Sequence, residues 1–191
     1  MVVAVVSPNS SESSDRALVR ACLRGETQPF GHLYRRYQYQ VRSTLFQLCG
    51  EEHLDDLVQD VFLRAWKGLP GFKHSAKFST WLYRITWNVA SDRRRDYAKR
   101  RERFQTAVAN LPTESNRRSQ LTQLHYQDLV QQGLAQLSLE HRTVLVLHDL
   151  EDLPQKEVAE ILDVPIGTVK SRLHHARAGI RQFLQARGIE L

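Results

Sequence analysis

The sequence contains little of what secreted, membrane-spanning or disulfide-linked proteins need. Cysteine occurs only at Cys22 and Cys49, which is too few for a disulfide framework, and the apolar neighbours of each favour a buried thiol. No window approaches the ~20 consecutive apolar residues of a membrane span. The short apolar run at the start is not preceded by a basic segment, so we expect no secretion signal. These absences favour a cytoplasmic protein.

Patterns typical of enzymes and metal sites are also missing. None of the eight histidines forms a His-x-x-x-His pair beside a carboxylate, and no glycine-rich phosphate loop occurs. His174 and His175 are adjacent, and adjacent side chains point to different sides of a helix. We therefore expect neither enzymatic activity nor a metal or other cofactor.

Positive charge is what the chain has in excess. Its net charge is +6 and its isoelectric point about 9.6, which favours a polyanionic partner. The basic residues form one dense block between Arg93 and Arg103 and a second set between Lys170 and Arg187, whereas acids gather between Glu51 and Asp60. This separation suggests different faces for different partners. An ordinary solvated basic helix is the alternative for the first block.

Apolar residues recur with the period of a helix, and no run alternates as a strand would. We expect helices over about 15–24, with Asp15 as N-cap, over 29–49, over 54–69, and from a cap at Ser79 or Thr80. The helical pattern weakens at about 101–119. The predicted fold is therefore all-α, with two small helical domains over 15–98 and 125–187, a flexible linker over 99–124 and a disordered tail over 1–14.

The helix over 54–69 has two distinct faces. Its core stripe recurs at spacings of three and four, and consists of Leu54, Leu57, Val58, Val61, Phe62, Ala65, Trp66 and Leu69. The opposite face carries acids around one apolar residue: Asp56, Gln59, Asp60 and Leu63. Such a face suits a helical partner carrying arginines, although single exposed leucines are common.

Aromatic rings and cations mix in the next segment, which contains Phe72, Lys73, His74, Lys77, Phe78 and Trp81. Rings can stack on unpaired bases while cations follow phosphates. Further along the expected helix, Arg84 and Asn88 share an outward side, and an asparagine amide can pair with a base edge. The alternative is that Phe72, Phe78 and Trp81 are simply core residues.

The last part of the chain has a helix-turn-helix pattern. A helix capped by Ser138 is expected to reach about Leu150, and the motif follows, with a helix over 154–162, a break over 163–165 and a second helix from Ile166 or Gly167. The outward residues of that second helix suit major-groove docking: Thr168, Lys170, Ser171, Arg172, His174 and His175. Some helix-turn-helix units make only protein contacts, which is the alternative.

Two segments resemble one family in the order that the family has. Asp56 to Trp66, followed by Phe78 to Ile85 and Asn88, closely resembles region 2 of extracytoplasmic-function (ECF) sigma factors, and Leu137 to Ile180 resembles their region 4. The resemblance covers roughly residues 15–98 and 125–187. It implies an alternative sigma factor of the sigma-70 family, which directs RNA polymerase to promoters and catalyses no reaction.

The resemblance also implies roles for individual residues. Asp56, Gln59 and Asp60, with Leu63 on the same face, match the positions that dock on the polymerase β′ coiled coil. The 72–78 loop and Asn88 match the elements that open −10 promoter DNA and hold a flipped base; Trp81 and Arg84 lie on the same expected helix. Lys170, Ser171, Arg172, His174 and His175 match the helix that enters the −35 major groove. The implied partners are core RNA polymerase, through its β′ coiled coil and β flap, promoter DNA and an anti-sigma factor.

Two other functions compete with this interpretation. A stand-alone helix-turn-helix regulator would bind duplex DNA without needing the acidic face. A module that binds polymerase but not DNA would be unaffected by loss of Lys170 and Arg172. The acidic face and the second basic set therefore discriminate among the three.

Overall fold

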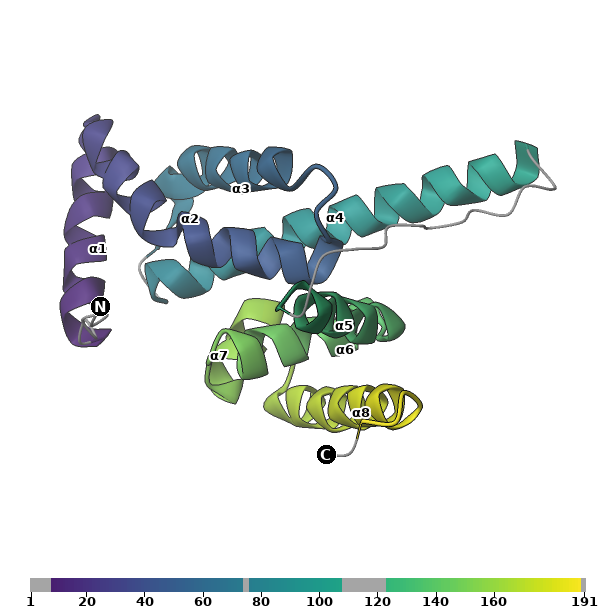
Figure 1. The fold of residues 1–191 in the computed structure, drawn as a ribbon. Coiled ribbons are helices and arrows are strands. Elements are labelled where there is room, and N and C mark those ends of the chain that lie inside the picture. Colours follow the sequence, from purple (N-terminus) through teal and green to yellow (C-terminus); the bar gives the residue numbers. More distant parts are fainter. Residues whose placement is uncertain (1–7, 74–75, 108–122, 190–191) are drawn as a thin grey trace.

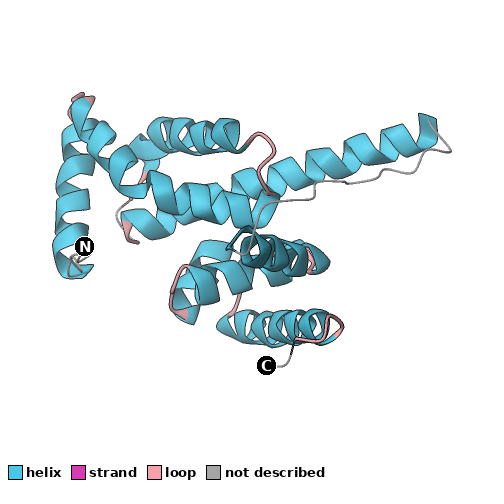
Figure 2. Ribbon diagram, in the orientation of Figure 1, coloured by secondary structure: helices cyan, strands magenta, loops and turns pink. Residues whose placement is uncertain are grey.

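The computed structural model describes residues 8–73, 76–107 and 123–189, which are folded almost entirely into helices (Figure 1). Within these residues no strand occurs (Figure 2), as the all-α prediction requires. The first group consists of α1 (Pro8–Leu23), α2 (Gln28–Cys49), α3 (Leu54–Gly68) with the 3-10 turn η1 (Leu69–Gly71), and α4 (Phe78–Ala107). The second consists of α5 (Gln123–Gln136), α6 (Leu139–Leu145) with the π turn η2 (Val146–Leu150), α7 (Gln155–Leu162) and α8 (Ile166–Gln185).

Several expected helix ends are confirmed. α2 ends at Cys49, and Gly50 follows it with a positive φ of 82°, which suits glycine. Ser138 caps α6 and accepts a hydrogen bond from the backbone N of His141. Pro154 precedes α7 without a side-chain cap, and α8 begins at Ile166.

Two predicted caps are wrong. α1 begins at Pro8, so Asp15 lies inside the helix, where its carboxylate is buried against Arg36 and Tyr37. α4 begins at Phe78, so Ser79 and Thr80 are also helical. Aspartate and threonine can form buried hydrogen bonds as well as helix caps. Here Asp15 bonds to residues of α2, and Thr80 bonds to Glu157 of α7.

The helical segments differ from the predicted domain limits in two places. α1 includes the last residues of the tail expected over 1–14, and α4 continues to Ala107, beyond the expected boundary at residue 98. Residues 1–7 and 108–122, which hold the rest of the predicted tail and much of the predicted linker, lie outside the described residues.

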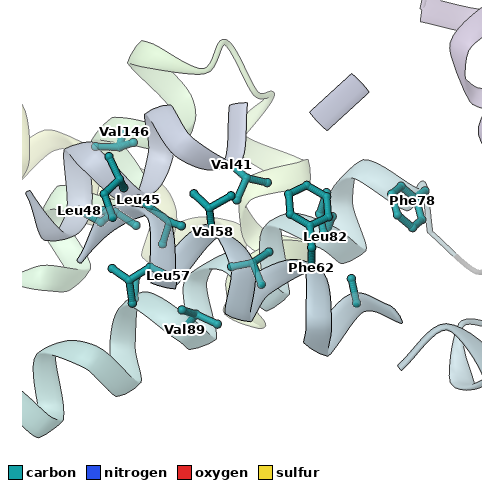
Figure 3. Close-up of a cluster of buried hydrophobic side chains, with 14 of the residues drawn as sticks. Val41, Leu45, Leu48, Leu57, Val58, Phe62, Phe78, Leu82, Val89 and Val146 are labelled. Carbon is teal, nitrogen blue, oxygen red and sulfur yellow. The ribbon is translucent and has the colours of Figure 1, made fainter. Parts of the chain in front are cut away.

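The core of the first domain lies where α2, α3 and α4 meet (Figure 3). Seven residues of the α3 stripe are buried as predicted: Leu54, Leu57, Val58, Val61, Phe62, Ala65 and Leu69. Trp66, the eighth, is instead 37% exposed and packs edge-on against Phe30. It lies at the margin of the stripe, so only part of its ring reaches the core.

The second domain packs the helix-turn-helix around its own cluster. Val158, Val169 and Leu173 are buried, and Asp163 turns the chain with a left-handed backbone at φ 54°. Leu134 of α5 and Leu137 just after it are buried, whereas Val130 of α5 is 45% exposed.

The two domains are packed against each other. Val146 of η2 joins Leu48 of α2 in the large core cluster (Figure 3). Tyr83 of α4 is buried in the other cluster, among residues of the helix-turn-helix domain. Helices α5 to α8 thus form one group beneath α2 and α4, with α8 on the far side of that group (Figure 1).

Candidate protein and nucleic-acid interfaces

The outer face of α3 is displayed as the sequence predicts. Asp56, Gln59 and Leu63 are exposed and Asp60 is half-buried. Leu63 is 49% exposed although it is a large apolar residue. Asp60 pairs with Arg64 at 2.9 Å, and Arg64 also reaches Asp92 at 2.8 Å. These hydrogen bonds raise the pKa of Arg64 and fix the acid next to Leu63.

A groove of about 620 Å³ runs beside this face, between α2 and α3. Gln59 and Leu63 form part of its wall, and the rest is largely aromatic: Phe30, Tyr34, Tyr39, Phe62 and Trp66. Tyr39 is 75% exposed. Exposed aromatic and aliphatic side chains around a groove are the usual composition of a protein-binding surface.

Sequence reasoning missed the α2 side of this groove. One signal was present, because Tyr34 and Tyr39 fall outside the buried α2 positions Leu33, Val41 and Leu45. Large rings off the core face of an amphipathic helix indicate a second packing surface.

The segment before α4 combines a buried ring with exposed cations. Phe72 is buried, with its ring centroid 6.1 Å from that of Phe78 and 5.1 Å from that of Trp81. Lys73 and Lys77 are exposed and Trp81 is half-buried. Phe72 and Phe78 are therefore core residues in this conformation, in agreement with the alternative interpretation. His74 lies outside the described residues.

Arg84 and Asn88 lie one turn apart on α4, and both are exposed. The Arg84 guanidinium donates to the backbone carbonyls of Glu160 and Ile161, the latter at 3.4 Å. A residue predicted to contact DNA thus contacts the second domain here.

The outward side of α8 is open. Lys170, Ser171, His174 and His175 are exposed, and Thr168 and Arg172 are half-buried. His174 and His175 do not point fully apart, since their ring centroids are 5.6 Å from each other. A shallow groove of about 230 Å³ continues the basic surface along Lys170, His174, Arg177 and Arg181. The basic side chains thus follow one side of α8.

The second domain also has an apolar groove that the sequence did not predict. Its volume is about 310 Å³, and its walls come from α5, η2 and α8 through Val130, Leu134, Leu150, Ile180, Phe183 and Leu184. Val130 and Leu150 are 45% and 47% exposed at its rim. Because the groove is formed by three segments that are distant in sequence, the hydrophobic pattern of any one of them does not predict it.

In the described part of the chain, every helix is too short or too polar to span a bilayer. Among the same residues, no three His, Cys, Asp or Glu side chains are grouped as metal ligands would be.

Comparison with known families assigns both domains. The family described as sigma-70 region 2 matches residues 33–101, and the family described as sigma-70, region 4, matches residues 127–179. The first match contains α3 with its acidic face and the start of α4. The second contains the helix-turn-helix.

Whole-length relatives agree with these matches. The ECF RNA polymerase sigma factor SigW of Bacillus subtilis is 30% identical, over 87% of this chain and 95% of its own length. The ECF RNA polymerase sigma-E factor of Escherichia coli K12 is also 30% identical, over 92% and 97%.

Solved structures share the fold. CnrH, in complex with the cytosolic domain of CnrY, superposes with a TM-score of 0.69 at 26% identity, covering 91% of this chain and 98% of that one. The sigma factor RpoE of Bartonella quintana, in complex with the anti-sigma factor NepR, gives 0.68 at 24% identity, covering 83% and 98%. Together with the two region matches and the full-length relatives, this likeness shows that the chain belongs to the ECF sigma factors of the sigma-70 family, non-enzymatic DNA-binding proteins that direct transcription initiation.

Proposed function

We propose that this sigma factor works in the cytoplasm through three surfaces, one that binds core polymerase and two that bind promoter DNA. The α3 face of Asp56, Gln59, Asp60 and Leu63 binds the β′ coiled coil of core polymerase. The 72–78 loop and α4 capture the −10 strand. The outward side of α8 reads the −35 duplex. The exposure of Leu63 one turn after Gln59 and Asp60, beside an aromatic groove, is the observation that carries the polymerase assignment.

The chemistry of the α3 face suits a partner helix with arginines and apolar residues. Acids attract and orient the arginines, while Leu63 and the rings of Tyr39 and Trp66 offer apolar area of the kind that dominates binding energy. A regulator acting alone on duplex DNA would have no use for this combination. The apolar groove of the second domain is the corresponding candidate for the β flap, because its walls could take an apolar helix face.

Purified core polymerase provides the direct test of this function. Run-off transcription on a set of candidate promoters should depend on adding the chain, and co-purification should yield a complex with the core enzyme. Failure to associate with core polymerase, with no inhibitor present, would contradict the proposal. An anti-sigma factor as a further partner is an expectation from the family.

Asn88 is the candidate for hydrogen bonding to the flipped −10 base. Replacing it by alanine removes a bidentate pair worth about 1–3 kcal/mol, so open-complex formation should fall roughly tenfold. Permanganate footprinting on a promoter found by run-off measures this. A template already unpaired at −10 is the control, because it removes the cost of extruding the base. Unchanged permanganate reactivity of the −10 thymines with Asn88→Ala would contradict this role.

Lys170 and Arg172 are the candidates for −35 phosphate contacts. Each alanine substitution should flatten the slope of log K against log salt by roughly 0.9 for a −35 duplex. Lys67→Ala, an exposed lysine on α3, is the matched control and should leave the slope unchanged. Fluorescence anisotropy over a salt series measures both. Equal slopes for all variants would exclude these two side chains as phosphate contacts.

A further inference from the structure

We propose that binding of the −35 duplex is coupled to protonation of a histidine cluster, which His141 at the start of α6 forms with His174 and His175 of α8. The inference rests on the proposed assignment of the outward side of α8 to the −35 duplex. Affinity for that duplex should rise as the pH falls from about 8 to about 6, within the range in which histidine changes charge.

The three rings lie close together on the second domain. The ring centroids of His141 and His175 are 5.8 Å apart with 28° between the ring planes, so His141 stacks on His175. The ring of His174 is 5.6 Å from that of His175 and lies edge-on to it. His174 and His175 are exposed, and His141 is half-buried. A histidine from another helix thus joins two residues that the sequence predicts to contact DNA.

The cluster lies among the other residues that we assign to the duplex. Lys170 is one turn before His174, and Ser171 is one turn before His175. Lys170 and His174 also line the same shallow groove, together with Arg177. α8 lies on the side of its domain away from α4 (Figure 1), which leaves this surface accessible to a duplex.

Positive charge predominates near the rings on α8. The charged residues of this helix within one turn of the two rings are Lys170, Arg172 and Arg177. Asp149 of η2 accepts two hydrogen bonds from the Arg177 guanidinium, at 2.9 and 2.6 Å. This acid is therefore already engaged by an arginine.

The helices packed against α8 bring few charges toward the cluster. Their described charged residues are Glu140 and Arg142 of α6, Lys156, Glu157 and Glu160 of α7, and Asp128 of α5. Arg142 is turned inward to the Leu48 carbonyl, and the three charged residues of α7 line a pocket beside α4. Asp128 accepts a hydrogen bond from Gln132, and Glu140, which precedes His141, is exposed.

None of the three rings is paired with an acid. In the described part of the chain, His53 and His148 are the histidines within salt-bridge distance of a carboxylate. The cluster is therefore free to take phosphate as its anionic partner.

Protonation changes what an imidazole ring can do at a DNA surface. A neutral ring has one N–H donor and one acceptor nitrogen, whereas a protonated ring has two donors and a positive charge. Phosphate oxygens and the N7 and O6 atoms of guanine are all acceptors, and an anion favours the charged form of a nearby ring. Proton uptake and duplex binding should therefore strengthen each other.

The full chain and a −35 duplex, taken from a promoter found by run-off transcription, provide the test. Fluorescence anisotropy at fixed ionic strength should show binding roughly tenfold tighter at about pH 6 than at about pH 8, as expected for uptake of about one proton. Calorimetry near pH 7 in two buffers of different ionisation enthalpy should show net proton uptake.

Glutamine variants assign the effect to the cluster. His174→Gln and His175→Gln in one chain should reduce the change in affinity over this pH range to less than about twofold, because glutamine does not titrate. His32→Gln, exposed on α2, is the matched control and should keep the native dependence. A double variant with the native pH dependence would contradict the inference.

His141 is the positioning residue of the cluster, because its stacked ring restricts the ring of His175. His141→Phe keeps a flat ring and should keep the pH dependence, whereas His141→Ala should reduce it to roughly threefold. Circular dichroism at both pH values checks that each variant is folded. If the native chain binds the duplex equally at both pH values and takes up no proton, the coupling is wrong although α8 binds DNA. If no form of the chain binds the duplex at any pH, the assignment of α8 fails instead.

Discussion

Leu63→Lys should weaken assembly with core polymerase by roughly 100-fold, the effect of losing one central interface residue and gaining a repelled charge. Leu63 is 49% exposed one turn after Gln59 and Asp60 on α3 and forms part of the aromatic groove wall. The substitution removes apolar area and sets a cation against the arginines that the acidic face would attract. Surface plasmon resonance with immobilised core enzyme measures the dissociation constant.

Leu23→Lys is the matched control, because Leu23 is 45% exposed at the end of α1 and lies away from the groove. It should bind polymerase as the native chain does, and both variants should melt at similar temperatures since neither side chain is buried. If Leu63→Lys keeps full affinity while the native chain binds, the α3 face is not where polymerase docks.

Asp15→Asn should lower the free energy of unfolding by about 2 kcal/mol, because it weakens hydrogen bonds that a buried charged carboxylate accepts. Asp15 is 4% exposed and accepts hydrogen bonds from Arg36 and Tyr37 of α2. Burial, followed by the hydrogen bond to Asp15, raises the pKa of the Tyr37 hydroxyl, so that hydroxyl stays a donor. The amide would remove the charge that holds α1 on α2. Urea denaturation followed by circular dichroism measures the change.

Asp55→Asn offers the same change in an exposed ion pair. Asp55 pairs with Arg42, but their side chains are 85% and 48% exposed, so its loss should cost less than about 1 kcal/mol. The comparison separates the effect of burial from the effect of removing an aspartate charge. Equal stabilities for the two variants would show that the Asp15 pair contributes no more than a surface one.

The sequence was sufficient for features that depend on one helix at a time. Buried and exposed sides of α3 follow from spacings of three and four, and the α8 positions Val169, Leu173 and Ala176 are buried for the same reason. The break at Asp163 and the cap at Ser138 are local and were also predictable.

Features that depend on partners distant in sequence could not be predicted. Aspartate is a common N-cap residue, and nothing in the local sequence of Asp15 indicates that its partners would be Arg36 and Tyr37 of another helix. The groove beside Leu63 exists only because α2 and α3 place Tyr39 and Trp66 next to it. The contacts of Thr80 and Arg84 with α7 need both domains in place. Periodicity reports which face of a helix is covered, but not by what.

Tyr83 links the stability of the two domains. Its ring belongs to α4 but is buried in the hydrophobic cluster of the helix-turn-helix domain. Heating should therefore melt both halves in one cooperative transition, since neither keeps its complete core once the other is lost. The same ring would face water in a fragment ending after the first domain, which would give such a truncated chain a tendency to aggregate.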